Sequence, residues 1–316
     1  MAQRQESAGA LPRFGADRRA EDARLVRLAT YAAVAVAGVL IAAKMAAWLA
    51  SDSVAMLSSL IDSSLDAGAS IINLLAVRQA LVPADREHRF GHGKAEALAG
   101  LGQAAFIAGS SLFLLFEAMG RLAQPHPPAQ GELAVAVMLG SIVLTAALVT
   151  FQHHVKRRTN SLAIGADALH YKSDLLANLA VIVAILLATK LGWNMADPVF
   201  ALAIGAYILY SAFAILRGSL DQLLDHELPD EMRQRIKAIA MRHPEVHDLH
   251  DLRSRMSGRD VFIQLHLEMT PTLTLLRAHE VSDEVELEIR QDFPSAEVII
   301  HQDPQGVEQT PTAQRA

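Results

Sequence analysis

The segment 57–75, LSSLIDSSLDAGASIINLL, has the composition of a hydrophobic helix but carries two carboxylates, Asp62 and Asp66. An ionised carboxylate at the centre of a bilayer costs roughly 2.5 to 3.5 kcal/mol on insertion scales, so hydrophobic helices normally exclude it. The two side chains are four residues apart and therefore project from the same face of a helix. The residues that surround this face must compensate the charge.

Other hydrophobic segments lie on both sides of this helix in the sequence. The chain has 316 residues, of which 52% are hydrophobic, and a mean hydropathy of +0.24. A helix needs about 20 apolar residues to cross a bilayer core of about 30 Å. Six segments approach this length, which predicts an all-α bundle of six transmembrane helices. They are residues 25–50, 55–81, 95–122, 132–153, 161–190 and 197–220.

Basic residues are concentrated on one side of these spans, near the N-terminus, in the 82–94 loop and after the fourth span. The other side has little beyond Arg121 and Lys190. By the positive-inside bias, both termini and the 82–94 loop are predicted to be cytoplasmic. Residues 1–24 contain no apolar run that would make a signal peptide, and we expect a disordered cytoplasmic arm there. The transmembrane domain is expected at residues 25–222.

Residues 223–304 have the character of a soluble domain. An amphipathic helix begins near Pro229 and ends before Pro244, and VFIQLHLEM (261–269) alternates between apolar and polar residues as a strand does. With a strand at about 247–256, a second helix at about 273–292 and a final strand in AEVIIH, the element order is αββαβ. This order predicts a cytoplasmic α+β domain with its helices on one face of a sheet. Residues 305–316 are expected to be a disordered tail.

The fifth span repeats the spacing of the second, because His170 and Asp174 are also four residues apart. We expect neither helix to supply a lysine or arginine to these residues, so we expect a bound cation to supply the counter-charge. Asp62, Asp66, His170 and Asp174 form a four-ligand set of the kind that Zn(II) accepts, whereas Ca(II) and Mg(II) prefer larger shells of oxygen. Asp167, Asn178 and Lys44 are interpreted as packing or snorkelling residues.

Several alternatives remain open at this point. The four residues could be polar packing residues, although polar contacts between membrane helices are normally made by Ser, Thr or Asn. An intramembrane metal-dependent hydrolase would need an open metal position and a nearby general base, and no spare glutamate is expected at that depth. A membrane-anchored metal sensor would leave the buried carboxylates without a purpose. The chain has no cysteine, and its net charge of −6 without a basic stripe argues against nucleic-acid binding.

Taken together, the motifs of this chain resemble those of the cation diffusion facilitator family, in particular its bacterial zinc and ferrous-iron efflux members. The matching segments run from about residue 25 to 304 and are LIDSSLDAGAS (60–70), PADREHRFGHGKAEALA (83–99), LHYKSD (169–174), LPDEMRQ (228–234), HDLRSRMSG (250–258), IQLHLEM (263–269) and VIIHQDP (298–304). The resemblance implies a secondary transporter and not an enzyme. It further implies a homodimer in the bacterial cytoplasmic (inner) membrane, a metallochaperone-like cytoplasmic domain, and exchange of divalent metal ions for protons across the lipid bilayer.

The resemblance also implies three metal sites. The transport site maps onto Asp62, Asp66, His170 and Asp174. A cytoplasmic-loop zinc site maps onto Asp85, His88 and His92, a segment that by its residues alone would be a solvated charged loop. A binuclear zinc centre near the dimer interface maps onto the C-terminal domain, at His250, His266, His279, His301 and Asp303. Zn(II) is thus expected both as the substrate and as a structural or regulatory ion.

Overall fold

The computed structural model describes the chain except for residues 1–12, 52–53, 124–131, 192, 194 and 307–316. The chain divides into two compact units, one of residues 17–220 and one formed mainly by residues 221–316. The first unit is helical and the second contains the sheet.

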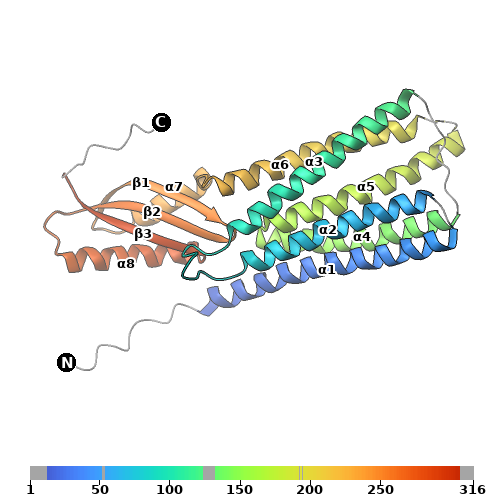
Figure 1. Cartoon of the computed structure of the whole chain (residues 1–316). Coiled ribbons are helices and arrows are strands. Elements are labelled where there is room, and N and C mark those ends of the chain that lie inside the picture. Colours follow the sequence, from blue (N-terminus) through green and yellow to red (C-terminus); the bar gives the residue numbers. More distant parts are fainter. Residues whose placement is uncertain (1–12, 52–53, 124–131, 192, 194, 307–316) are drawn as a thin grey trace. The chain divides into compact units, whose positions relative to one another are not determined.

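Long helices build the first unit, and except at the start of α1 and the end of α4 their bounds agree closely with the six predicted spans (Figure 1). They are α1 (Arg13–Ser51), α2 (Val54–Ala80), α3 (Lys94–Ala123), α4 (Glu132–Thr159), α5 (Leu162–Leu191) and α6 (Ala196–Leu223). Within the described residues, five of them are long and apolar enough to cross a membrane, and α5 is the one outside that group. With its 30 residues α5 nevertheless has the length of a spanning helix. The predicted helical bundle is confirmed.

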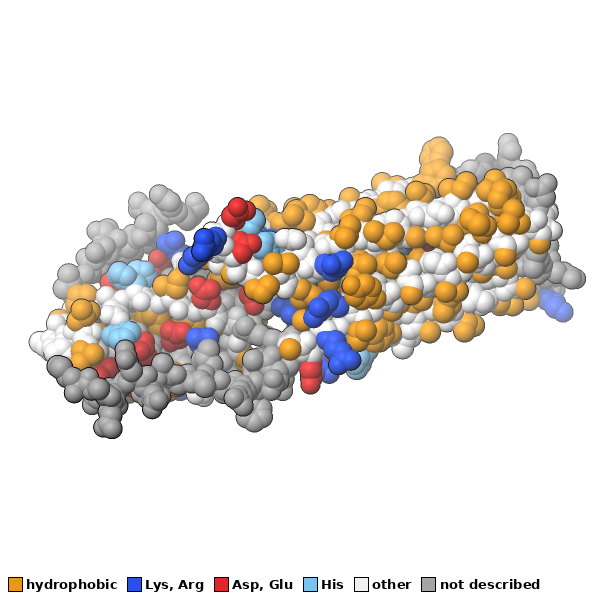
Figure 2. All heavy atoms as spheres, turned by 60° about the horizontal axis from the view of Figure 1, so that its bottom comes forward, with side chains coloured by type: hydrophobic (Ala, Val, Ile, Leu, Met, Phe, Trp, Pro, Cys, Tyr) orange, Lys and Arg blue, Asp and Glu red, His pale blue; other side chains and the backbone are white. Residues whose placement is uncertain are grey.

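The helical unit has an apolar exterior, as a bilayer requires. Phe113, Phe116 and Tyr210 are 68%, 77% and 76% exposed. Figure 2 shows hydrophobic side chains over the visible face of the helices, with lysine and arginine gathered towards one end. The interior contains many small or polar residues, among them Ala33 and Ser70, which let membrane helices approach closely.

Helix α1 begins earlier than predicted. The expected disordered arm covered residues 1–24, but the helix already starts at Arg13. Arg158 near the end of α4 forms ion pairs with Glu21 and Asp22 in this first part of α1, and its Nε lies 3.1 Å from Asp22 Oδ1. These pairs give the polar part of the helix a partner that hydropathy does not reveal. The remainder of the arm, and most of the predicted tail, lie outside the described residues.

The second unit has the predicted αββαβ order: α7 (Asp230–Ala240), β1 (Val246–Ser257), β2 (Asp260–Met269), α8 (Leu275–Asp292) and β3 (Ala296–Pro304). The sheet order is β1-β2-β3, with β1 antiparallel and β3 parallel to the central strand β2. Ile263, Leu265 and Leu267 of β2 are at most 1% exposed and share one core with residues of both helices. Both helices therefore cover the same face of the sheet.

Replacing Ile263 by Ala should destabilise the second unit, because the side chain is fully buried and its loss leaves a cavity. Substitutions of this kind cost about 2 to 5 kcal/mol. Hydrogen exchange of the peptide 260–269 in the full-length protein measures the free energy of opening. Leu287→Ala is the matched control, since Leu287 on α8 is 49% exposed. Equal effects of the two substitutions would contradict the assignment of the core.

Candidate metal sites

The helical unit brings Asp66 of α2 together with His170 and Asp174 of α5. His170 Nε2 lies 3.1 Å from Asp66 Oδ1 and 3.9 Å from Asp174 Oδ2. One ligand atom from each of the three residues falls within 4.8 Å of the others. His170 is only 5% exposed, and its Nε2 meets both carboxylates in contacts of ion-pair distance. This buried nitrogen and the two carboxylates offer three donors to a cation.

Asp62, the fourth predicted ligand, lies outside this cluster of three but lines the same cavity. The cavity has a volume of about 580 Å³ and is bordered by Asp62, Asp66, His170 and Asp174. Direct ligation by Asp62 stays a prediction. Glu117 of α3 also lines the cavity, about three helical turns beyond Phe106.

Two buried groups of hydrogen bonds hold α5 in its orientation. Asp167 is fully buried, and it accepts bonds from Gln103 Nε2 of α3 at 3.0 Å and from Gln152 Nε2 of α4 at 2.6 Å. On the other side, Tyr171 Oη lies 2.8 Å from Ser70 Oγ of α2. These contacts agree with the packing role inferred for Asp167. Since His170 stands between Asp167 and Tyr171 in sequence, both groups hold the part of α5 that carries it.

Lys44 of α1, interpreted as a packing or snorkelling residue, packs against α2. Its Nζ donates hydrogen bonds to Ser63 Oγ at 2.7 Å and to the Ser59 carbonyl at 3.2 Å, both on α2. Lys44 also lines a small cavity together with Asp66 and Asp174. The side chain is thus turned towards the carboxylates and not towards a membrane surface. Lys172 of α5 corrects the expectation that neither helix has a basic residue at this depth, although its Nζ donates to Tyr207 Oη at 2.6 Å.

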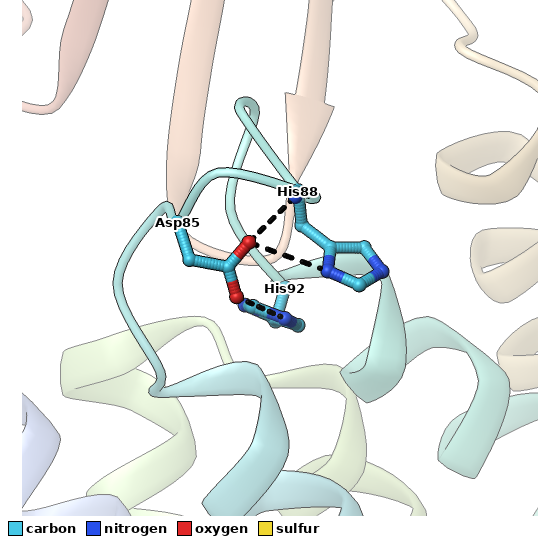
Figure 3. Close-up of side chains that lie close together, drawn as sticks. All are labelled: Asp85, His88 and His92. Carbon is cyan, nitrogen blue, oxygen red and sulfur yellow. Dashed lines mark hydrogen bonds and ion pairs between the residues drawn. The ribbon is translucent and has the colours of Figure 1, made fainter.

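The loop between α2 and α3 brings Asp85, His88 and His92 together (Figure 3). The carboxylate of Asp85 lies 3.5 Å from His88 Nδ1 and 3.5 Å from His92 Nε2. The backbone N–H groups of His88 and Glu87 donate to Asp85 Oδ1 at 2.6 and 2.9 Å and hold the pKa of this carboxyl below its usual range. Gly91 has a φ of 75°, a left-handed conformation that glycine adopts without strain. The segment is therefore a compact turn with an ionised carboxylate between two imidazoles.

The sheet of the second unit aligns three histidines across its strands. His250 of β1 is the register partner of His266 of β2, which in turn is the partner of His301 of β3. Asp303 reaches all three rings, with its carboxylate oxygens 3.3 Å from His250 Nε2, 2.8 Å from His266 Nδ1 and 3.3 Å from His301 Nε2. One carboxylate that contacts three imidazoles is a donor set that suits zinc.

His279, the fifth residue predicted for this centre, is not part of the row. It lies on the exposed side of α8 with its Nε2 3.6 Å from Asp283 Oδ2. Strand alternation explains the separation: His266 projects from the face opposite Leu265, and α8 packs on the Leu265 face. Its role in the centre stays a prediction.

Two acidic residues beside this row were missed by the sequence reasoning. Glu268 Oε1 lies 3.5 Å from His250 Nδ1, and Asp251 Oδ2 lies 3.8 Å from His266 Nε2. The alternation of β2 could have identified Glu268, which is two residues from His266. Nothing in the sequence indicates the irregular pairing of β1 between His250 and Arg253 beside Asp251.

Comparison with known proteins covers nearly the whole chain. The family described as "Cation efflux transmembrane domain" matches residues 30–224, and "Cation efflux protein, cytoplasmic domain" matches residues 228–305. The chain is 51% identical over 285 residues to the cation-efflux pump FieF of Shewanella oneidensis, covering 90% of this chain and 96% of that protein. It is 49% identical over 292 residues to the cation-efflux pump FieF of Klebsiella pneumoniae, covering 92% and 96%. A solved structure of the zinc form of CzrB matches with 31% identity and a TM-score of 0.26, covering 27% of this chain and 99% of that one.

Asp66→Asn and His170→Ala should each abolish Zn(II) binding at the membrane site, because each removes one member of a three-residue cluster. The number of Zn(II) ions bound by the detergent-solubilised protein, measured by calorimetry, should fall by one per chain. Asp230→Asn is the control, since this carboxylate lies on α7, remote in sequence from all three clusters, and its side chain is 86% exposed. Unchanged stoichiometry in both cluster variants would refute the site.

Asp85→Asn and Asp85→Ala separate the two roles of Asp85. Asparagine keeps an oxygen that accepts the two backbone N–H groups but loses the charge, whereas alanine loses both. Zn(II) binding at the loop should therefore fall in both variants, while proteolysis of the loop should increase only in Asp85→Ala. Equal protease sensitivity of the two variants would contradict the role in the turn.

The loop site should also lose Zn(II) on acidification, because protons compete with the metal ion for its ligands. The lowered pKa of Asp85 keeps its carboxylate ionised further down in pH than an ordinary aspartate, because its charge is lost only as the pH falls through the folded-state value. Zinc titrations of the loop in the full-length protein at several pH values measure this. Zn(II) binding that does not weaken on acidification would contradict a site built from these residues.

Proposed function

The chain belongs to the cation efflux family, and we propose that it exports divalent metal ions from the cytoplasm in exchange for protons, with Zn(II) as the favoured substrate. It is a multi-pass membrane transporter with a cytoplasmic C-terminal domain, and it is not an enzyme. The bacterial cytoplasmic (inner) membrane, with both termini inside, is the location that the bacterial relatives and the basic loops support.

The main support for a divalent metal ion as the substrate is one cluster: Asp66, His170 and Asp174 lie close together within a membrane-spanning bundle. Carboxylates there need a cation, and an imidazole nitrogen beside them favours a borderline metal ion over Ca(II) or Mg(II). Cd(II), Fe(II), Co(II) and Ni(II) would accept the same donors. Zn(II) suits the tetrahedral set that Asp62 would complete.

The exchange for protons follows from the chemistry of these ligands. Aspartate and histidine bind a metal ion only in their deprotonated forms, so protons and metal ions compete for the same atoms. When the site faces the cytoplasm, the ligands capture the metal ion. When it faces outward, protons displace the ion, and the inward proton gradient drives the cycle.

The large cavity supports an outward path from this site. Helix α3 starts after the predicted cytoplasmic loop, and the cavity follows it from Phe106 to Glu117, towards its distal end. On α2, which runs in the opposite direction, Asp62 precedes Asp66 and so lies farther from the cytoplasm. These positions support release of the ion towards the outer half of the bundle.

The two other clusters support a regulatory or structural use of zinc. The row of His250, His266 and His301 around Asp303 has donors for more than one ion. We infer that zinc there stabilises a homodimer through the cytoplasmic domains. We further infer that the loop cluster of Asp85, His88 and His92 binds an additional ion on the cytoplasmic side.

Transport of Zn(II) into proteoliposomes should require a pH gradient and should move protons in the opposite direction. A zinc-sensitive dye and a pH-sensitive dye inside the vesicles measure both fluxes. Asp66→Ala and His170→Ala should reduce both to the level of empty liposomes, while Asp230→Asn should transport normally. Zinc flux that is independent of the pH gradient would contradict the exchange, and intact flux in both cluster variants would contradict the site.

A further inference from the structure

We propose that Lys44 is the fixed counter-cation of the membrane metal site and that its charge limits the affinity of the site for the metal ion, so that the ion is released rapidly. This inference rests on the proposed transport role of Asp66, His170 and Asp174. It assigns a function to a residue on a third helix, α1, which contributes no metal ligand.

The hydrogen bonds of Lys44 hold its ammonium group in one place. Nζ donates to Ser63 Oγ at 2.7 Å and to the Ser59 carbonyl at 3.2 Å. Ser63 is 3% exposed, so this anchor lies inside the bundle. An ammonium group has three donors, and the two serine oxygens use two of them. The third donor is available to groups on the side of the carboxylates.

A small cavity connects the ammonium group to the carboxylates. It has a volume of about 30 Å³ and is lined by Lys44, Ser63, Asp66 and Asp174, among others. A space of this size holds about one water molecule, which can bridge an ammonium and a carboxylate. Electrostatic interactions link Lys44 with Asp66, Asp174 and Asp62. The charge of Lys44 therefore acts on all three acidic residues of the site.

The cargo reaches the same carboxylates from a different side. Asp66 and Asp174 line both cavities, whereas Lys44 lines the small cavity and is absent from the described lining of the large one. A metal ion that enters through the large cavity therefore meets the carboxylates without displacing Lys44. Both cations then act on the same ligands at once.

The net charge of the site explains how Lys44 can help it to hold and release a metal ion. Asp62, Asp66 and Asp174 carry three negative charges when ionised, and a neutral His170 adds none. A divalent ion and Lys44 together carry three positive charges, which balance these three aspartates, whereas without Lys44 one negative charge is left over. Neutrality lowers the cost of holding the loaded site in a medium of low dielectric constant. The repulsion between the ammonium and the metal ion also opposes tight binding.

Three substitutions separate the charge of Lys44 from its packing. Lys44→Met removes the charge and both hydrogen bonds, and Lys44→Gln removes the charge but keeps two donors for the serine oxygens. Lys44→Arg keeps the charge. The Zn(II) affinity of the membrane site is measured by calorimetry on the full-length protein in a background that lacks His88 and His266, and transport is measured in proteoliposomes.

Lys44→Met and Lys44→Gln should bind Zn(II) about tenfold more tightly than the parent protein. Both KM and kcat for transport should fall, because tighter binding slows release. Lys44→Arg should stay within about threefold of the parent in all three quantities. A purely structural role would lower the amount of folded protein without tightening Zn(II) binding.

Unchanged or weaker Zn(II) binding in folded Lys44→Gln would overturn the proposal. If Lys44→Met does not fold, Lys44→Gln alone decides, since it retains the donors to α2. Asp66→Asn in the same background distinguishes failure of this inference from failure of the proposed function. Loss of Zn(II) binding in Asp66→Asn, with unchanged affinity in Lys44→Gln, rejects only the role of Lys44. Intact binding in Asp66→Asn rejects the metal site itself.

Discussion

The helical unit depends on one constraint, which is that charge inside a bilayer must be compensated from within the protein. Asp66 and Asp174 satisfy it by meeting His170 across α2 and α5, with the ammonium of Lys44 nearby. This requires the helices to approach closely, and small residues such as Ala33 and Ser70 allow that approach. The same constraint explains why Asp167, which lacks a cation of its own, is bonded by the amides of Gln103 and Gln152.

In the cytoplasmic unit, the alternation of side chains along each strand determines where the histidines lie. A strand that alternates apolar and polar residues sends Leu265 into the core and His266 to the opposite face. Because the neighbouring strands are in register, His250 and His301 come to the same level of the sheet. The helices stay on the apolar face, so the histidines lie on the opposite face of the sheet.

Much of this architecture could be predicted from the sequence, because hydropathy and periodicity are local properties. The bounds of α2 and α5 and the order of the cytoplasmic elements follow from them, and the pairing of Asp66 with His170 follows from spacing together with the cost of buried charge. What could not be predicted depends on contacts between distant segments. The extension of α1 to Arg13 accompanies ion pairs made by Arg158, and the orientation of Lys44 depends on Ser59 and Ser63 of another helix. The separation of His279 from the histidine row requires knowing which face of the sheet α8 covers.

The order in which the strands are synthesised has a consequence for the histidine row. Strand β3, which carries His301 and Asp303, follows β1 and β2 in the chain, and Asp303 is the residue that touches all three rings. Strands β1 and β2 can pair earlier as a hairpin, but without β3 their histidines have no shared carboxylate. The three rings and the carboxylate therefore come together only once β3 has paired in parallel with β2.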